Sequence, residues 1–174
     1  LVTIAHQDDY YDPDYLEEVL KALNKQEDNV QIAFTDYYEW RKHRRIVRNT
    51  LLKIKRILLF PLRFRALGNS CFIKRRVLSL GNPICCPSVT LVKSMVGDAG
   101  YDETYQNSCD YKTWARLSKE EGMFLYIPKL LMGHRIHEES ATTKNLAEGI
   151  RQKEDFEILC EFWPKWIARG INKI

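Results

Sequence analysis

The sequence lacks acidic residues over a long central stretch. No Asp or Glu occurs between Glu39 and Asp98, whereas residues 41–76 contain 13 Lys or Arg. With Lys93 this interval carries a charge of +14, so the remainder of the chain is net negative, because the whole chain has a formal charge of +4. Charge is therefore segregated along the chain, and this segregation favours a surface that meets an anionic partner.

The sequence also lacks the features of a membrane-spanning, secreted or zinc-binding protein. No apolar run reaches the roughly 20 residues that cross a bilayer, and the first residues do not resemble a signal peptide. The five cysteines are odd in number and include no Cys-x-x-Cys pair, so we expect neither a disulfide framework nor a zinc site. These absences favour a soluble protein of the reducing cytoplasm. The chain begins at Leu1, inside what reads as a core strand, so we expect a piece of a longer protein.

The hydrophobic pattern predicts an α/β protein. A length of 174 residues fits one domain, and 45% hydrophobic residues are enough for a packed core. Strand-like and helix-like periodicities alternate along the chain, with Pro128 as a turn between the last two strands. We expect strands over residues 2–8, 30–37, 89–92, 123–127 and 130–137, and helices over residues 13–26, 47–58, 62–67, 108–121 and from 146 onward.

Two adjacent carboxylates end the first predicted strand. Asp8 and Asp9 follow an apolar, β-branched run, and open α/β sheets bind ligands just beyond the carboxyl ends of their strands. Adjacent carboxylates repel each other, so a fold that brings them together usually provides a cation or hydrogen-bond donors. The alternative is a helix entry, with Asp12 as the N-cap and Pro13 at the first helical position.

Residues 41–76, the basic segment, contain a predicted amphipathic helix. Its apolar stripe consists of Val47, Leu51, Ile54 and Leu58 at helical spacing, and Pro61 ends or kinks the helix. Two interpretations stay open: a solvated helical hairpin that packs its stripe on its own domain, or a surface for anionic lipid headgroups or a phosphorylated acceptor. Nucleic acid is not expected, because no nucleic-acid-binding motif accompanies the charge.

Several polar or reactive residues have structural interpretations. Asp36 ends the second predicted strand and is expected to cap or stabilise a turn. The vicinal pair Cys85 and Cys86 is expected to pack in the interior, since buried cysteines are far commoner than redox pairs. Trp114 is expected in the core.

The acidic segment resembles the metal-binding segment of the inverting glycosyltransferases of family 2. Residues 7–17, QDDYYDPDYLE, match that family's run of acids, an aromatic residue, a proline and a helix containing Leu-Glu. The resemblance implies that Asp8 holds a divalent cation, Mn²⁺ or Mg²⁺, which bridges the two phosphates of a nucleotide sugar, and that Asp9 belongs to the same cofactor site. His6 stands where the family has the first acid of its Asp-x-Asp motif, which departs from the pattern.

Residues 107–117, NSCDYKTWARL, resemble the family's Glu-Asp-x-Asp-x-Trp-x-Arg-Leu run. Matched on Trp114, the resemblance places the catalytic base on Asp110, while Cys109 and Lys112 replace neighbouring acids. A carboxylate held at a helix start and facing a cleft can accept a proton. The structural alternative for Asp110 is a helix cap.

Two further stretches carry the resemblance. Residues 81–88, GNPICCPS, are similar to a family stretch beneath the acceptor cleft, and residues 134–140, HRIHEES, are similar to the closing Tyr-Arg-x-His-x-x-Ser element. This implies that Arg135 and His137 contact the diphosphate and that His137 can complete the shell of the cation. As isolated residues, His134 and His137 would be polar groups at the end of a strand.

The resemblance implies the second half of an A-type glycosyltransferase (nucleotide-diphospho-sugar transferase) fold, with a mixed central sheet flanked by helices and without the amino-terminal nucleotide-binding segment. Within one domain, residues 1–174, it assigns the metal-motif strand, helix and next strand to 1–40, a basic helical insertion to 41–80, the acceptor and catalytic part to 81–142, and a C-terminal helix to 143–174.

The implied reaction moves a sugar, with inversion, from a nucleoside diphosphate sugar to a hydroxyl group of a glycan or lipid-linked acceptor. Such a reaction belongs to cell-surface polysaccharide or glycolipid synthesis at the inner face of the cytoplasmic membrane. The alternative is a non-catalytic fragment or degenerate relative that binds anionic surfaces, including membranes, through residues 41–76.

Overall fold

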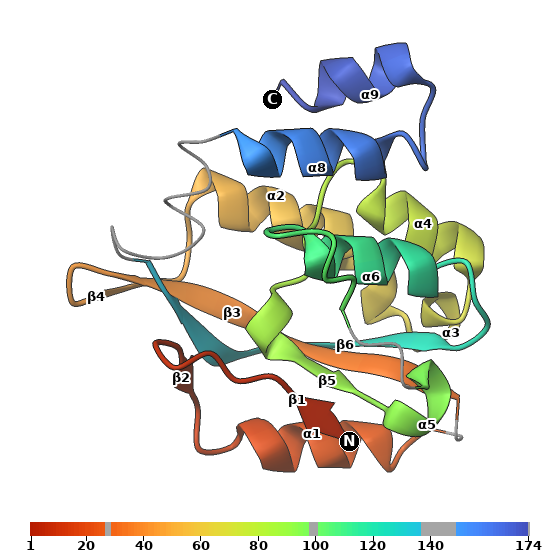
Figure 1. The fold of residues 1–174 in the computed structure, drawn as a ribbon. Helices are drawn as coiled ribbons and strands as arrows, with labels where there is room; N and C mark the ends of the chain where they lie inside the picture. The colour runs from red at the N-terminus through yellow and green to blue at the C-terminus, as the bar shows by residue number, and fades with distance from the viewer. Residues whose placement is uncertain (27–28, 98–100, 137–148, 174) are drawn as a thin grey trace.

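A six-stranded mixed sheet forms the centre of the computed structural model, which describes residues 1–26, 29–97, 101–136 and 149–173 (Figure 1). The long strands β3 and β6 pair in parallel, and every other pair is antiparallel. The prediction of an α/β protein with a mixed sheet flanked by helices is therefore confirmed. The strand order is β1 (Val2–Thr3), β5 (Val89–Leu91), β3 (Val30–Arg41), β6 (Met123–Arg135) and β2 (Tyr10–Tyr11), with β4 (Arg44–Ile46) paired to β3.

Helices cover both faces of the sheet. Helix α1 lies on one face, and α2, α4, α6 and α8 lie on the other, with α9 packed beyond α8 (Figure 1). The C-terminal segment holds two helices, α8 and α9, where the sequence predicts one. The helical elements are α1 (Tyr15–Leu23), α2 (Thr50–Leu59), η1 (Phe60–Arg63), α3 (Arg65–Gly68), α4 (Cys71–Leu78), η2 (Cys86–Ser88), α5 (Lys93–Val96), α6 (Cys109–Leu117), α8 (Ile150–Leu159) and α9 (Lys165–Ile171).

Alternation of side chains along β3 and β6 divides the core in two. Successive strand residues point to opposite faces, so Phe34 and Phe124 join the larger cluster with Trp114 of α6. Ala33 and Leu125 face the other way and pack against α1. Trp114 is completely buried, as predicted.

The first predicted strand is wrong in both length and position. Only Val2 and Thr3 are in strand conformation, at one edge of the sheet, and Val2 and Ile4 are each 41% exposed. The chain then crosses to the opposite edge, where Tyr10 pairs with Gly133 of β6. An edge strand has one neighbour instead of two, so the apolar run is not enclosed as a central strand would be. Asp8 and Asp9 therefore lie in the crossing between two edge strands.

Pro128 does not form the predicted turn. Strand β6 runs through it, and the register moves from Ile127 opposite Thr35 to Leu130 opposite Asp36, which leaves Pro128 and Lys129 without partners in the parallel pairing with β3. Proline has no N–H group to donate to a neighbouring strand, so a bulge is the place within a sheet that accepts it.

The stripe predicted for the basic helix does not pack into the interior, because an ion pair holds another face of α2 against the sheet. Leu51 and Ile54 are 52% and 50% exposed. The Nε of Arg56 lies 2.7 Å from Oδ2 of Asp36, a buried residue within β3 rather than the predicted cap. The same guanidinium donates to the carbonyl oxygens of Val47 and Tyr37. Leu52 and Leu59 share the face of Arg56 at helical spacing, and both are buried.

A second cation of the basic segment is internal. The Nζ of Lys74 donates to Oε1 of Gln31 and to the carbonyl oxygens of Leu117, Glu120 and Gly122. These carbonyls lie at and just beyond the C-terminus of α6, where a cation also interacts favourably with the helix dipole. Lys74 thereby ties α4 to the end of α6, the helix that carries Asp110.

The first prediction concerns the ion pair under α2. Arg56→Met would leave the Asp36 carboxylate in the interior without its partner, which typically costs about 3 kcal/mol or more. We expect the free energy of unfolding, measured by urea titration, to fall by about that amount, and the double variant with Asp36→Asn to recover part of it. Lys53→Met, an exposed position on the same helix, is the matched control. A loss below about 1 kcal/mol, as for exposed pairs, would contradict the anchoring role.

Candidate functional site

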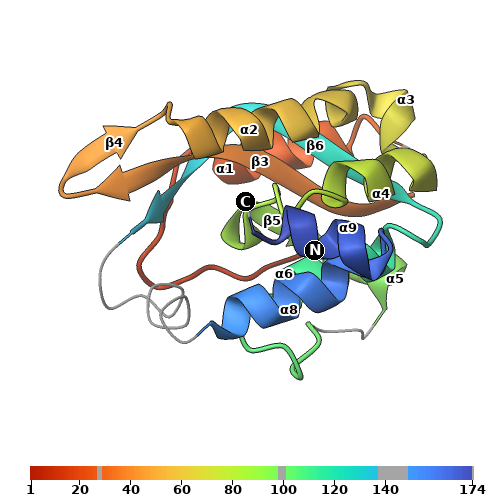
Figure 2. The same cartoon turned by 90° about the horizontal axis from the view of Figure 1, so that it is seen from above.

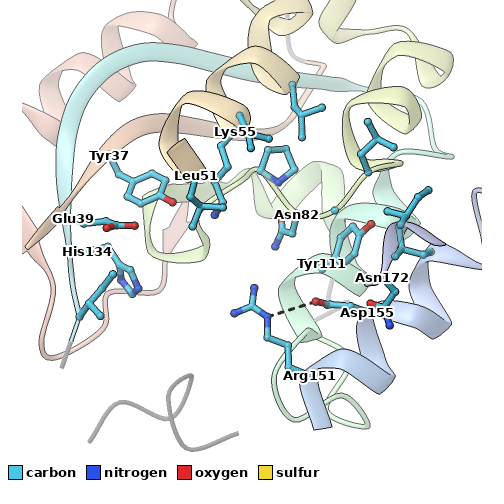
Figure 3. A pocket seen from close by; sticks show the side chains of 18 of the residues that line it. Tyr37, Glu39, Leu51, Lys55, Asn82, Tyr111, His134, Arg151, Asp155 and Asn172 are labelled. Atoms are coloured by element: carbon cyan, nitrogen blue, oxygen red, sulfur yellow. Dashed lines mark ion pairs between the residues drawn. The ribbon is translucent and has the colours of Figure 1, made fainter. Parts of the chain in front are cut away.

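A cavity of about 490 Å³ opens on the helical side of the sheet. Figure 2 shows α2 and α8 on opposite sides of the view with α9 between them, and all three contribute to its wall. In Figure 3, Glu39 and His134 project from strands β3 and β6, and Lys55 projects from α2. Asn82 lies near the centre of the view, and Arg151 projects from α8 on the opposite wall. The cavity therefore brings together side chains from the sheet, the basic helix and the C-terminal helices.

His6, Asp8 and Asp9 form an acidic cluster beside the part of the cavity that β6 lines. Their potential ligand atoms lie within 4.8 Å of one another. The side chain of Asp9 is 1% exposed, and its Oδ1 accepts a hydrogen bond from the backbone N–H of Arg135 and lies 3.1 Å from Nδ1 of His134. His134 in turn lines the cavity. The acidic cluster is therefore joined to the cavity through one histidine.

The Asp9 carboxylate keeps one oxygen available for a ligand. Its Oδ2 is buried and has no hydrogen-bond partner among the described residues; it lies 3.6 Å from Nδ1 of His6, an ion pair when that imidazole is protonated. A buried, unpaired carboxylate oxygen is costly unless something binds it. Carboxylates suit hard divalent cations such as Mg²⁺ and Mn²⁺, whereas imidazole is a common ligand of Zn²⁺, Cu²⁺, Fe²⁺ and Ni²⁺. The residues present thus fit a divalent cation held by Asp8, Asp9 and His6.

Asp110 lies in the first turn of α6 and is fixed by two hydrogen bonds. Its Oδ2 accepts from Nδ2 of Asn82 at 2.9 Å, and its Oδ1 accepts from the backbone N–H of Tyr111 at 2.7 Å. Oδ1 of Asn82 accepts from the N–H of Ile84, which fixes the orientation of the Asn82 amide. Because Asn82 and Tyr111 both line the cavity, Asp110 stands directly behind its wall.

Burial governs the ionisation of Asp110. Desolvation raises the pKa of its carboxyl group above the usual value, while the Tyr111 N–H, Arg151, Asn82 and Lys55 each act in the opposite direction. Desolvation prevails, because withdrawal from water disfavours the charged form more than these groups favour it. A carboxylate with a raised pKa is a better proton acceptor than a solvated one.

Helix α8 holds the loop that leads into α6. The Glu154 carboxylate accepts hydrogen bonds from three consecutive backbone N–H groups, those of Gln106, Asn107 and Ser108. The Ser108 hydroxyl donates to Oδ1 of Asp155 on the same helix. These bonds bridge residues almost 50 positions apart in sequence, so the position of Asp110 depends on the C-terminal helices.

Lys55 points from α2 toward the cavity without a polar partner. In the part of the chain that the structure describes, no hydrogen bond or ion pair reaches its ammonium group, and its neighbour is the ring of Tyr37, 5.3 Å from Nζ. Burial lowers the pKa of Lys55, and Arg151 lowers it further, whereas Cys85, Asp110 and Glu39 raise it. An unpaired cation in such a place favours an anionic ligand.

The predicted site residues are distributed unevenly around this cavity. Asp8 and Asp9 belong to the acidic cluster, and Asp110 lies behind Asn82. The side chain of Arg135 is exposed and does not line the cavity. Its neighbours His134 and Ile136 line the cavity, because side chains alternate between the two faces along the strand. His137 lies outside the described residues.

The sequence interpretation missed three residues of the site. Sequence reasoning gives His134 only a strand-end role, Asn82 only a place in the stretch that resembles the family's segment beneath the acceptor cleft, and Lys55 only a place in the basic segment. The period-2 alternation of β6 was the available signal for His134, which takes the face opposite to Arg135. For Asn82 and Lys55 the decisive contacts are tertiary, with Asp110 and Tyr37.

The cysteines and Lys112 have structural roles. The five thiols are free, as predicted, and burial raises the pKa of Cys86 to about 12 and raises that of Cys85 well above its usual value. Both thiols are therefore protonated at neutral pH and are poor nucleophiles. Lys112 pairs with Glu161 at 2.5 Å and so ties α6 to the segment after α8.

Comparison with known proteins gives no assignment. A scan against protein-family models and a search of the curated proteins both yield no match to this sequence. The function is therefore inferred from the cavity and its residues.

Proposed function

We propose that this chain carries the catalytic part of a metal-assisted transferase that acts on a diphosphate-bearing donor. More narrowly, we propose an inverting glycosyltransferase of family 2, with an A-type fold, that transfers a sugar from a nucleoside diphosphate sugar to an acceptor hydroxyl group. One observation carries the proposal: a single cavity reaches the acidic cluster through His134 and Asp110 through Asn82. Two carboxylate sites, each joined to the same cavity through one lining residue, suit a reaction with a leaving anion and a proton to remove.

In this proposal the donor diphosphate lies near the acidic cluster. Asp8, Asp9 and His6 would hold the divalent cation, Mn²⁺ or Mg²⁺, which when bound neutralises charge on the leaving diphosphate. His134 orients Asp9 through its contact with Oδ1, leaving Oδ2 for the cation. A role for Arg135 and His137 at the diphosphate stays a prediction.

Asp110 would accept the proton of the acceptor hydroxyl group. Its raised pKa favours proton acceptance, and Asn82 and the Tyr111 N–H hold its two oxygens in place. Glu154 prevents the loop before α6 from moving the base. Positioning of this kind accounts for a large share of catalytic power, because small displacements of a catalytic group greatly reduce the rate.

A second candidate function is binding to an anionic membrane surface. Ile57 is 71% exposed, and the rings of Phe60 and Phe64, each more than half exposed, contact each other beside it. Lys53, Arg63 and Arg65 are exposed in the same segment. Exposed aromatic and aliphatic groups among cations are typical of surfaces that insert shallowly into anionic bilayers. Within the described part of the chain, no helix is long and apolar enough to cross a membrane.

The metal role can be tested with Mn²⁺ alone. Asp8→Asn keeps the size of the side chain but removes a charged ligand, so we expect the affinity for Mn²⁺, measured by electron paramagnetic resonance of the free ion, to fall at least about tenfold. Asp14→Asn, an exposed acid just before α1 with no capping bond, makes the same charge change and should leave the affinity unchanged. Equal losses in both variants would show that general surface charge, not this cluster, attracts the ion.

The role of the base can be tested in the full-length protein with Asp110→Asn. Loss of the proton acceptor should lower kcat by about a hundredfold or more while donor binding persists. The wild-type rate should rise with pH through the raised pKa of Asp110, and the variant should lose this rise. Because the folded pKa is raised, the wild type should also lose stability relative to the variant as pH increases from about 3.9. A decrease in kcat below tenfold would leave Asp110 as a structural residue of the helix start.

The membrane candidate calls for variants other than simple charge reversal at residues 53–56. Arg56 anchors α2 and Lys55 faces the cavity, so we choose Phe60→Ser with Phe64→Ser. Co-sedimentation with vesicles containing anionic lipid should fall severalfold, and wild-type binding should weaken with salt. Leu16→Ser, which is 62% exposed on α1, is the control and should bind as the wild type does. Wild-type protein that does not sediment at low salt would rule out this function.

A further inference from the structure

The outer face of α2 forms an apolar wall of the cavity. Leu51 and Ile54 are each about half exposed, at 52% and 50%, and with Leu58 they line the cavity at helical spacing. Ile171 of α9 and Pro83 contribute further apolar wall. Several neighbouring aliphatic side chains left partly open to one cavity indicate an apolar ligand more than a bare phosphate.

Two cations interrupt this apolar wall. Lys55 follows Ile54 on α2, and Arg151 reaches the cavity from α8, on the opposite wall (Figure 3). Arg151 is only loosely engaged, because its Nε lies 3.5 Å from Oδ2 of Asp155. Together they place positive charge on two sides of the aliphatic part of the cavity, whose lining also includes the carboxylates of Glu39 and Asp155.

The nearby carboxylates do not neutralise Lys55. Glu39 contacts Nε of Arg41 at 2.9 Å and accepts a hydrogen bond from Asn49. Asp110 accepts hydrogen bonds from Asn82 and from the Tyr111 N–H. Each acid thus has its own partners, and the Lys55 ammonium is the group left without a polar one in the described structure.

The direction of Lys55 is imposed by the fold. Arg56 is fixed to Asp36 under the helix, and successive residues of an α-helix are turned by about 100°. Lys55 is therefore held to the cavity side, whereas Lys53 is exposed to solvent. A free surface lysine would have no such constraint.

We propose that this cavity binds a lipid phosphate, with the phosphate between Lys55 and Arg151 and the alkyl chain along Leu51, Ile54 and Leu58. A guanidinium group matches phosphate oxygens in a bidentate manner, and an ammonium group adds a point charge. The row of aliphatic side chains along α2 gives an alkyl chain continuous apolar contact, which the polar ribose of a nucleotide would not use. The further step, in which the lipid phosphate is the acceptor of the sugar, rests on the proposed function. The binding of the lipid phosphate to the cavity does not rest on it.

The test uses the full chain and calorimetry with n-octyl phosphate below its micelle concentration. Lys55→Met should weaken octyl phosphate binding at least about tenfold, whereas Lys53→Met, two residues away on the same helix, should not change it. Ile54→Ser should also weaken octyl phosphate binding, and Ile57→Ser, an exposed residue outside the cavity lining, should leave it intact. Inorganic phosphate should bind much more weakly than octyl phosphate, and n-octanol should not bind.

Several results would overturn the proposal. Equal affinity for inorganic phosphate and octyl phosphate would show a site for a free anion in which the chain is not recognised. Equal effects of the Lys53 and Lys55 variants would show non-specific attraction by surface charge. Unchanged binding in Lys55→Met would overturn it outright, provided that the melting temperature shows an intact fold.

The outcome is separable from that of the transferase proposal. Octyl phosphate binding needs neither a divalent cation nor a donor, so it persists in a metal-free sample with Asp110→Asn if the site is as described. Binding together with an unaffected kcat in Asp110→Asn would retain the lipid phosphate site and reject the base. Loss of kcat in Asp110→Asn without octyl phosphate binding would retain the base and reject the lipid.

Discussion

The ion pair between Arg56 and Asp36 determines how the basic segment is used. It fixes the rotation of α2 on the sheet, and with it the direction of each side chain along the helix. Leu52 and Leu59 turn inward beside Arg56, Lys55 turns to the cavity, and Ile57 turns outward. A different rotation would bury the stripe that instead lines the cavity. One buried contact thus separates the structural, ligand-facing and solvent-facing parts of a single helix.

The charge segregation seen in the sequence is partly cancelled in space. Arg41 and Arg56 meet acids of β3, and Lys74 is bound by carbonyl oxygens. The expectation that the basic segment needs an external partner for all its charge is therefore too strong. What remains is one enclosed cation, Lys55, and two sets of exposed cations. The first set is Lys42, Arg44, Arg45 and Arg48 at and after the turn between β3 and β4, and the second is Lys53, Arg63 and Arg65 near Phe60 and Phe64. Lys55 and the set near Phe60 and Phe64 combine charge with apolar surface, so they suit an anionic partner that also carries an apolar group.

Local periodicity predicted the elements well where a single face decides their packing. Helices α1 and α6 and the strand pattern of β3 follow from their own sequences. The rotation of α2 does not follow from its own sequence, because its partner Asp36 lies 20 residues away from Arg56. The edge position of Val2 and the bulge at Pro128 depend on neighbouring strands, so local periodicity does not predict them either. In the site, motif spacing predicted Asp8, Asp9 and Asp110. The roles of Asn82, His134 and Lys55 depend on contacts that form only in the folded chain.

The cavity offers two different means of holding an anion, at different places. At the acidic cluster, carboxylates repel a phosphate, so an anionic ligand can bind there only together with a cation. At Lys55 and Arg151 the cations belong to the protein, so an anion can bind directly. A chelator would therefore abolish binding at the first place and spare the second. In the proposed transferase, which would bind two phosphate-bearing substrates, this difference lets each site reject the other's ligand by its own charge.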